Sequence, residues 1–426
     1  MGDTIFAVSS GRPPAAIAVI RISGPAAIAT ARDLAGSLPD PREARMRALR
    51  DPDGRLLDRA LVIVFLAPAT ATGEDLVELH CHGGRAVVAA VEQVLTAVDG
   101  CRPALPGEFT RRALAHGRMD LAEAEGLADL LEAETEAQRV VALSAAEGRV
   151  SQQVGLWLAT IAALSARIEA ILDHDDEDDV VGGDAEIAAI GAEAERLAAD
   201  IAAVAAAPPV ERLRDGVRIV IAGPPNAGKS TLLNLLAERD VAIVTPIAGT
   251  TRDRLEAAVV RDGLPYLLID TAGLTETADM VEAIGVERAQ AAIAAADILL
   301  WLSDEAPPRS DALWVHARAD LPDRGVVPAG RHIAVRRDDA ASVALLWTGI
   351  AERAATMVPR ADALPLRERH RELCTRAATS LARAPEDPLL LGEVLRQARV
   401  ILAQITGVDA TEMMLDALFS RFCIGK

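Results

Sequence analysis

One short motif constrains the fold of this chain more than any other feature. Residues 223–230 read Gly-Pro-Pro-Asn-Ala-Gly-Lys-Ser and match the pattern GxxxxGK(S/T). An apolar stretch at 218–222 (RIVIA) precedes the motif and a helical pattern follows it, which is the context that the pattern requires. Strands and helices continue to alternate after the motif, with further apolar stretches at 266–269, 298–302 and 333–335. The motif therefore predicts a doubly wound, mainly parallel α/β sheet that carries a phosphate-binding loop.

The residues of the loop have distinct chemical roles. Gly223 and Gly228 let backbone N–H groups turn inward around phosphate oxygens. Lys229 supplies a point charge to the β and γ phosphates, and Ser230 offers its hydroxyl to Mg²⁺. A chance glycine-rich turn is the alternative, and the flanking strand and helix argue against it. The predicted contacts of the loop with a nucleoside triphosphate are Gly223, Asn226, Ala227, Gly228, Lys229, Ser230 and Thr231.

Two later segments complete a nucleotide site of the hydrolase type. Asp270-Thr-Ala-Gly273 follows an apolar strand, where the carboxylate can hold the metal's water shell and the Gly273 N–H can sense the γ phosphate. Residues 249–253 (GTTRD) lie between the two motifs, where a threonine hydroxyl can complete Mg²⁺ coordination. Alone, Asp270 could be a helix cap and 249–253 a polar loop. The order of the three elements favours a triphosphate hydrolase.

The base-recognition segment is incomplete. GTP hydrolases hold guanine with Asn-Lys-x-Asp, and the matching residues 317–320 read Ala-Arg-Ala-Asp. Asp320 can accept from guanine N1 and N2, and the stem of Arg318 can lie over the base. We predict GTP as the substrate, with an ATPase or a weakened domain as the alternative because Ala317 replaces the asparagine.

Composition limits the kinds of partner and the cellular location that this chain can have. The formal charge of −19 excludes a protein that coats nucleic acid non-specifically. The four cysteines lie far apart without a CxxC pair, which argues against a zinc site or a disulfide scaffold. No basic, apolar leader follows the first residue, and no apolar run approaches the ~20 residues of a membrane span. We expect a cytoplasmic protein that does not associate with a membrane.

The pattern of apolar residues changes along the chain, and 426 residues exceed the size of a single core, so more than one domain is expected. Up to about residue 105, short apolar runs at 16–22, 60–66 and 76–80 and a helical pattern at 86–98 predict a compact α/β domain. Residues 121–171 have helical spacing and no proline, which predicts one long amphipathic helix. Helical patterns return after the phosphate-binding domain, at 367–382, 389–405 and 411–419.

Several stretches together resemble the MnmE (TrmE) family of tRNA-modification GTPases over essentially the whole chain. They are 20–24 (IRISG), 73–75 (GED) with Glu78 and 82–84 (HGG), 106–113 (PGEFTRRA), 117–122 (GRMDLA), 125–129 (EGLAD), 249–253, 270–274 and the ending 419–426 (FSRFCIGK). The resemblance implies three domains. Residues 1–118 would form a folate-binding-like α/β dimerisation domain, 119–210 with 360–426 a helical domain, and 211–359 an inserted P-loop GTPase domain.

The resemblance also implies an activity and partners. A potassium-dependent GTP hydrolase would act as a homodimer with the flavoprotein MnmG, in a heterotetramer, to add a carboxymethylaminomethyl group to C5 of the tRNA wobble uridine. The one-carbon donor would be a reduced folate, 5-formyl- or 5,10-methylene-tetrahydrofolate. A regulatory GTPase that binds RNA or the ribosome without tRNA chemistry is the alternative, although the helical C-terminal segment does not resemble a basic RNA-binding module.

Further site residues are implied by position in the family. Potassium would be held by Asn226, Thr245, Ile247 and Thr250, and Mg²⁺ by Ser230 and Thr251. Glu282 would position the attacking water as a catalytic residue beside Lys229, with Glu287 as the nearby alternative. The implied GTP contacts beyond the loop are Thr245, Pro246, Ile247, Ala248, Gly249, Thr250, Thr251, Asp270, Thr271, Ala272, Gly273, Arg318 and Asp320.

The same comparison by position implies a folate site in the N-terminal domain. Its residues would be Arg21, Glu78, Arg118 and Lys426. Cationic groups suit the glutamate carboxylates of a folate, and Glu78 can accept from the pterin N–H groups. Arg118 stands where many relatives carry lysine, which keeps the charge and changes the donor geometry. Cys423 has a possible chemical role in the same pocket, or is a packed small hydrophobe.

Overall fold

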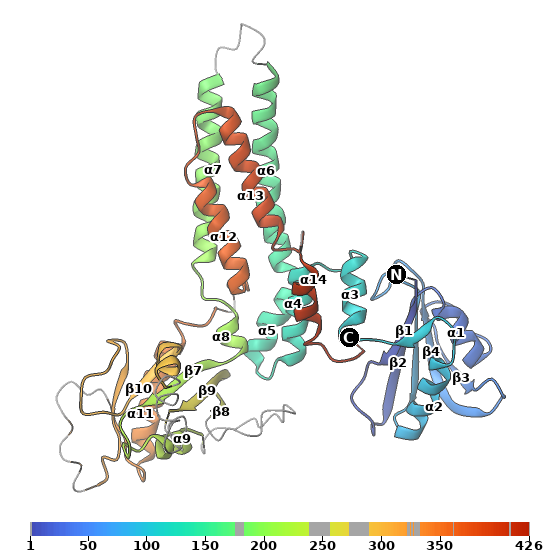
Figure 1. Ribbon diagram of the computed structural model, residues 1–426, viewed down its shortest axis with the longest axis horizontal. Helices are drawn as coiled ribbons and strands as arrows, with labels where there is room; N and C mark the ends of the chain where they lie inside the picture. The colour runs from blue at the N-terminus through green and yellow to red at the C-terminus, as the bar shows by residue number, and fades with distance from the viewer. Residues whose placement is uncertain are drawn as a thin grey trace, which may run out of the picture. The chain divides into compact units, whose positions relative to one another are not determined.

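The computed structural model describes residues 2–174, 183–237, 256–271, 289–321, 324, 327, 333–360, 362–408 and 410–425. The chain forms two compact units (Figure 1). One consists of residues 1–128 with 403–426, and the other of residues 129–402. The ends of the chain thus belong to the same unit.

The first unit is built on a six-stranded sheet with the order β3-β4-β5-β2-β1-β6. Its strands are β1 Thr4–Val8, β2 Ile17–Ser23, β3 Ala44–Arg50, β4 Leu56–Phe65, β5 Leu76–His82 and β6 Cys101–Pro103. All neighbouring strands are antiparallel except β1 and β6. The helices α1 Ala27–Ala35 and α2 Arg85–Thr96 pack their apolar side chains on one face of this sheet, in a core that includes Ile20, Leu79, Ala31 and Leu95.

Three helical segments complete the first unit. They are α3 Glu108–Ala115, the first part of α4 Leu121–Glu132, and α14 Glu412–Phe419 near the end of the chain. Leu121 and Ala124 pack with Leu418, Phe419 and Phe422 in one apolar cluster. The final segment therefore supplies part of the core of the N-terminal unit.

Helices form a long arm in the second unit (Figure 1). They are α5 Glu136–Ala146, α6 Arg149–His174, α7 Gly183–Ala205, α12 Glu368–Leu381 and α13 Pro388–Ala403. The single helix predicted over 121–171 is wrong, because α4, α5 and α6 divide it. Thr135 caps α5 in a capping box with Gln138, and Gly148 has a φ of +82°, so both breaks have a local cause.

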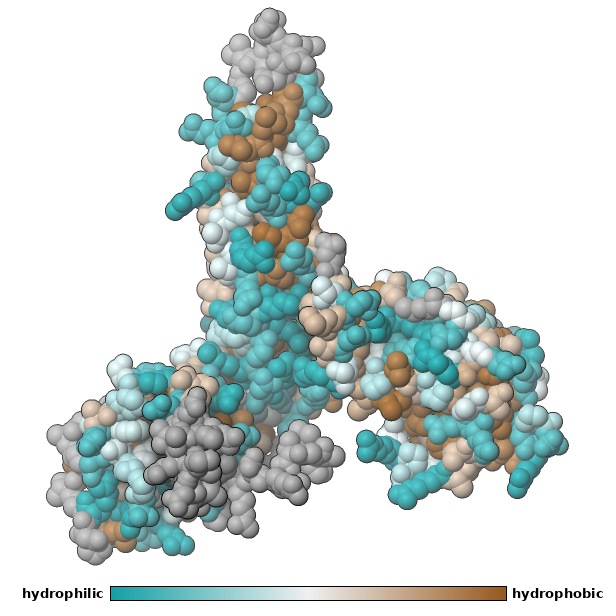
Figure 2. All heavy atoms as spheres, in the orientation of Figure 1, coloured by the Kyte–Doolittle hydropathy of each residue, from teal (hydrophilic) through white to brown (hydrophobic). Residues whose placement is uncertain are grey.

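The helix α6 is unusual in its apolarity. Its segment Arg149–Asp173 is long and apolar enough to cross a membrane by length and composition, with a mean hydropathy of 1.5. Yet Val154, Trp157 and Ile161 on this helix are buried within the arm. Arg167 also pairs with Glu186 and Glu193 of α7. Because 28% of the apolar window is buried, helix packing accounts for part of its apolar surface. Figure 2 shows that apolar side chains of the arm also reach its surface.

The second sheet has the order β12-β11-β10-β7-β9-β8. Its strands are β7 Val217–Ala222, β8 Glu256–Arg261, β9 Leu264–Asp270, β10 Ile298–Trp301, β11 Leu313–His316 and β12 Ile333–Ala334. Only β8 and β9 pair antiparallel. The helices α8 Glu211–Arg214, α9 Lys229–Ala237 and α11 Ala340–Ala354 belong to the same region. The predicted mainly parallel sheet is confirmed.

Candidate functional site

The glycine loop lies between β7 and α9, at the carboxyl end of a central strand. Gly223 and Gly228 have φ values of +154° and +96°, and Asn226 has a φ of +62°. A Cβ at Gly223 would lie 3.1 Å from the backbone carbon of Leu302. Left-handed backbone and close approach both favour glycine. The loop thus has the strand–loop–helix setting that the sequence predicts.

The Lys229 side chain is held inside this loop. The residue is 7% exposed, and its Nζ donates to the carbonyl oxygens of Gly223 and Pro224 at 2.9 and 3.0 Å. Burial lowers the pKa of Lys229, and the carboxylate of Asp270 opposes this effect. The ammonium group therefore lies where the loop's inward N–H groups would cradle a phosphate.

Ser230 and Asp270 meet beside the loop. Asp270 ends β9, opposite Ile221 of β7 in the parallel register. The Ser230 Oγ donates to Asp270 Oδ2, and Asp270 is 4% exposed. Thr271 follows, with its N–H and hydroxyl both donating to the Ile221 carbonyl oxygen. The structure thus brings a hydroxyl and a carboxylate together, and oxygen ligands of this kind suit Mg²⁺.

The base-recognition segment contacts the phosphate loop through Arg318. This residue follows β11 with a φ of +60°, and its Nη1 donates to the Asn226 carbonyl oxygen at 2.7 Å. Its Cγ and Cδ lie 3.2 Å from the position of a Cβ on Gly228. Ala317 is buried, whereas Asp320 is exposed. Arg318 therefore contacts the phosphate loop and Asp320 is exposed, while their predicted contacts with the base stay predictions.

Several predicted site residues lie outside the described residues. They are Thr245, Pro246, Ile247, Ala248, Gly249, Thr250, Thr251, Ala272, Gly273, Glu282 and Lys426. Their roles, including potassium coordination and water positioning, stay predictions. Of the remaining loop contacts, Ala227 precedes Gly228 and Thr231 lies in the first turn of α9.

Arg21 and Glu78 form the centre of a second polar site. They face each other on β2 and β5, on the sheet side opposite α1 and α2, because Ile20 and Leu79 point into the helix-covered core. The Arg21 Nη2 donates to Glu78 Oε1 at 2.8 Å. His80 Nε2 lies 3.2 Å from Glu78 Oε2. Both carboxylate oxygens of Glu78 are therefore engaged within the sheet.

The electrostatics of Glu78 follow from these contacts. Burial raises the pKa of the carboxyl, but the hydrogen bonds from Arg21 and His80 outweigh burial and hold the pKa below its usual value. The guanidinium carbon of Arg21 also lies 5.8 Å from the centre of the Phe109 ring of α3. The site thus has a charged pair beside an aromatic wall.

The other predicted folate residues lie near loops of the same unit. The Cγ of Arg118 is 3.3 Å from the position of a Cβ on Gly73, whose φ is +81°. A Cβ on Gly425 would lie 2.1 Å from the Val8 carbonyl oxygen. Cys423 is exposed. The end of the chain therefore runs against β1, the strand that pairs with the one carrying Arg21.

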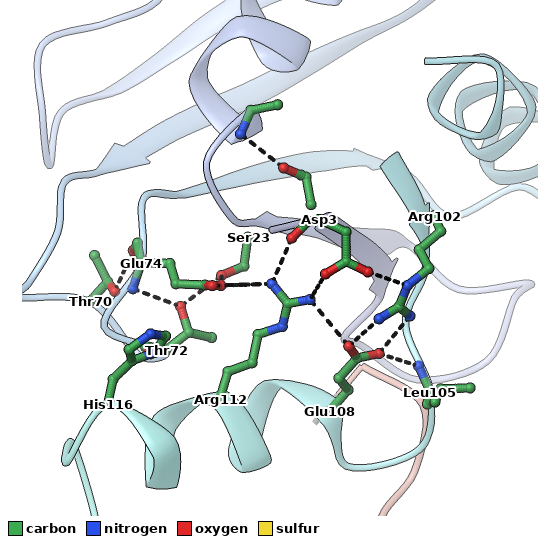
Figure 3. A network of polar contacts seen from close by, with 12 residues as sticks. Asp3, Ser23, Thr70, Thr72, Glu74, Arg102, Leu105, Glu108, Arg112 and His116 are labelled. Atoms are coloured by element: carbon green, nitrogen blue, oxygen red, sulfur yellow. Dashed lines mark hydrogen bonds and ion pairs between the residues drawn. The ribbon is translucent and has the colours of Figure 1, made fainter. Parts of the chain in front are cut away.

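A buried ion network underlies this region (Figure 3). The Arg112 side chain on α3 is 2% exposed. Its Nη1 donates to Glu74 Oε2 at 3.0 Å, and its Nη2 donates to Asp3 Oδ1 at 3.0 Å and Glu108 Oε1 at 3.2 Å. Arg102 adds a two-bond pair with Glu108, at 2.6 and 2.9 Å. Two carboxylates from other segments, those of Asp3 and Glu74, are thus joined to α3, which itself carries Glu108.

Sequence analysis did not assign a role to His80 or to this network. The i,i+4 spacing of Glu108 and Arg112 on a helix was the available signal for one pair. His80 stands two residues after Glu78, on the same face of a strand, which is the period-2 rule. The contacts with Asp3 and Glu74 join distant parts of the chain, so no local pattern indicates them.

A glycine loop with an enclosed lysine and a serine–aspartate pair, at the carboxyl edge of a mainly parallel sheet, defines the class of P-loop nucleotide-binding proteins. Two protein-family models match the chain. "GTP-binding protein TrmE N-terminus" matches residues 4–118, and "MnmE helical domain" matches residues 121–423. The chain belongs to the MnmE (TrmE) family.

Individual relatives are similar to this chain over its full length. The chain is 51% identical over 427 residues to a protein of Erythrobacter litoralis named tRNA modification GTPase MnmE, covering 100% of both chains. It is 52% identical over 434 residues to the protein of that name from Rhizorhabdus wittichii, covering 100% of this chain and 97% of the other.

Proposed function

We propose that this chain is a GTPase that acts in tRNA modification. The observation that carries the proposal is the phosphate loop, in which Lys229 is enclosed and Ser230 meets Asp270. Full-length similarity to proteins named tRNA modification GTPase supports the assignment. We propose that the protein acts on tRNA in the cytoplasm.

The residues of the loop divide the work of hydrolysis. The ammonium of Lys229 neutralises charge on the phosphate oxygens, and the loop N–H groups hold them in place. Ser230 and Asp270 fit Mg²⁺, because their oxygens are adjacent and Asp270 is buried. The ion supplies charge neutralisation when bound. Glu282 holds the attacking water through its carboxylate.

Potassium dependence is the finer part of the proposal. The left-handed conformation of Asn226 places an amide in the phosphate loop, and its backbone carbonyl is already fixed by Arg318. The side-chain oxygen of Asn226 would hold a monovalent cation, together with Thr245 and the backbone at Ile247 and Thr250. A cation there does the work of an arginine finger.

The tRNA chemistry belongs to the assembled protein. A homodimer joined through the N-terminal units works with the flavoprotein MnmG to add a carboxymethylaminomethyl group to the wobble uridine. The folate donor binds at Arg21, Glu78, Arg118 and Lys426. Two features support this assignment: the charged pair of Arg21 and Glu78 beside Phe109, and the end of the chain beside β1.

GTP hydrolysis in potassium and in sodium buffers of equal ionic strength tests the proposal. We expect strong stimulation by potassium in the wild type and none in Asn226→Ala. Equal slow rates in both salts would overturn the potassium mechanism. Competition with ATP in the same preparation tests guanine selectivity, which is in question because Ala317 replaces the asparagine of the Asn-Lys-x-Asp motif. Displacement of GTP by ATP at comparable concentration would disprove that selectivity.

The folate site is tested separately by equilibrium binding of a reduced folate. We expect saturable binding that Arg21→Ala abolishes. Arg32→Ala, on the exposed face of α1 in the same unit, is the matched control and should bind as the wild type does. Absence of saturable binding to the wild type would remove the folate donor from the proposal and leave the GTPase intact.

A further inference from the structure

The β3–β4 hairpin concentrates arginine at one edge of the N-terminal sheet. The two strands pair antiparallel, and β3 is the edge strand (Figure 1). Six arginines lie on or next to the hairpin: Arg42, Arg45, Arg47, Arg50, Arg55 and Arg59. We call them the hairpin arginines. Five of the six are exposed, and Arg47 is half-buried.

The charge of the chain is distributed unevenly, and this hairpin is one of its basic segments. In residues 129–402, Asp and Glu outnumber Lys and Arg by 16, and in the rest of the chain by three. In residues 42–59 the sign reverses, with arginine in excess by two. A polyanion would be repelled more strongly by the second unit than by this hairpin.

The hydrogen bonds of the hairpin arginines leave their charge available. Arg42 Nη2 donates to the Ala69 carbonyl oxygen at 2.6 Å, Arg47 Nε to that of Ser37 at 2.7 Å, and Arg50 Nη1 to that of Gly54 at 2.7 Å. A carbonyl oxygen fixes the direction of a guanidinium group without cancelling its charge. By contrast, Arg102 and Arg112 are each paired with carboxylates in the buried network.

Three of the four acidic residues in 42–59 have hydrogen-bond or ion-pair partners within the protein. Asp51 Oδ1 accepts from the Arg55 N–H at 2.8 Å. Asp58 accepts from the backbone and ring of His82, both at 2.7 Å. Glu43 does pair with Arg45, but both side chains are largely exposed, at 48% and 61%, and such pairs contribute little and exchange readily.

From these contacts we infer that the β3–β4 hairpin binds the phosphate backbone of an RNA, and that this RNA is the tRNA substrate. The inference rests on the proposed function for the identity of the RNA. Arg45 and Arg47 are two residues apart on an extended strand, so their stems are about 6.6 Å apart. Guanidinium groups bind phosphate oxygens through paired N–H donors, and such contacts position an RNA without reading its sequence.

Protection of the sheet edge is the competing explanation. Charged residues on an edge strand prevent pairing with another sheet. That role needs charge but not its sign, so glutamate would serve as well as arginine. A charge reversal therefore separates the two explanations.

The test is binding of fluorescently labelled unmodified tRNA to the full chain, measured by anisotropy over a series of KCl concentrations. The variants are Arg47→Glu with Arg50→Glu, and Arg47→Lys with Arg50→Lys. Each phosphate contact contributes about 0.7 to 0.9 to the slope of log affinity against log salt. We expect the glutamate pair to lower affinity at least tenfold and to reduce the slope by about 1.5, and the lysine pair to retain most of both.

The matched control reverses two exposed arginines of the acidic unit, Arg139→Glu with Arg396→Glu, and should change affinity less than twofold. Thermal unfolding of every variant verifies the fold. Wild-type affinity and slope in the glutamate pair would overturn the inference, as would absence of tRNA binding by the wild type. GTP hydrolysis in the same variants keeps the two questions apart, because its absence in the wild type would refute the proposed function instead.

Discussion

Arg112 is a buried cation that pairs with three carboxylates in the N-terminal unit. It lies on α3 with a side chain 2% exposed, between Asp3, Glu74 and Glu108. Replacement by leucine removes the cation, which leaves Glu74 with the Ser23 hydroxyl, and Asp3 and Glu108 with Arg102. Breaking such a pair costs about 3 to 5 kcal/mol. We expect Arg112→Leu to lose that much free energy of unfolding in urea, whereas Arg32→Leu on the exposed face of α1 should change it by less than about 0.5 kcal/mol.

The network also predicts a pH dependence. Burial raises the pKa of Glu108, but Arg102, the Leu105 N–H and Arg112 outweigh burial and lower it. A carboxyl whose pKa is lower in the folded state stabilises the protein above its unfolded pKa of about 4.3, and this stability is lost as the pH falls through the folded pKa. We therefore expect the melting temperature of wild type to exceed that of Glu108→Gln at pH 7, with the gap closing towards pH 3.

The control for that measurement is Asp33→Asn, an exposed acid on α1. It should follow the wild-type profile throughout. A gap between wild type and Glu108→Gln that stays constant from pH 7 to pH 3 would contradict the assignment of this stability to the ionised carboxylate.

Among the elements, α5 depends on one glutamine. The Gln138 Oε1 accepts from the Glu134 and Thr135 N–H groups, both at 2.8 Å. Its Nε2 donates to the carbonyl oxygens of Leu213 and Arg214, at 3.1 and 3.0 Å, in the short helix α8 that precedes β7. The residue is buried, so one side chain both caps α5 and attaches it to the entry of the nucleotide-binding sheet.

Gln138→Ala should therefore cost about 1 to 3 kcal/mol, because it leaves buried backbone groups without partners. The measurement is chemical denaturation of the full chain, followed by a probe in the second unit. Gln397→Ala removes a side chain that bonds only to exposed Glu393 and should be nearly neutral. A neutral Gln138→Ala would mean that water replaces these contacts.

Many helices and strands were predicted from the local sequence, whereas some of their boundaries and several strands were not. The strands around the phosphate loop and most helices were predicted from period and turn residues, since each pattern is local. The division of 121–171 into three helices was missed. The helical spacing of apolar residues continues through both breaks, and it conceals the cap at Thr135 and the left-handed Gly148 that end one helix and begin the next. The strands β1, β3, β6 and β8 were also missed. In β3, Arg45 and Arg47 stand on the same strand face as the buried Leu49, so the period-2 pattern is masked.

At the scale of the whole molecule, the two ends of the chain form one unit. Leu418, Phe419 and Phe422 complete an apolar cluster with Leu121 and Ala124. A chain that ends at residue 402 should therefore expose this cluster. We expect its N-terminal unit to melt at a lower temperature in calorimetry and to bind a hydrophobic dye, while the transition of the second unit is retained.

A synthetic peptide of residues 403–426 should restore the lost stability in a concentration-dependent way, since it binds only the folded state. A scrambled peptide of the same composition is the control. An unchanged transition in the shortened chain would show that the cluster is not needed for the N-terminal unit.

The sequence by itself determined the phosphate loop, its lysine and serine, the mainly parallel sheet and the family, because glycine spacing and apolar periods are local properties. Only the tertiary structure decided which distant groups meet. Arg21 pairs with Glu78, Arg318 reaches the Asn226 carbonyl, and Arg112 joins three carboxylates. These contacts depend on strand register and helix packing, which sum interactions over the whole chain, so no short segment encodes them.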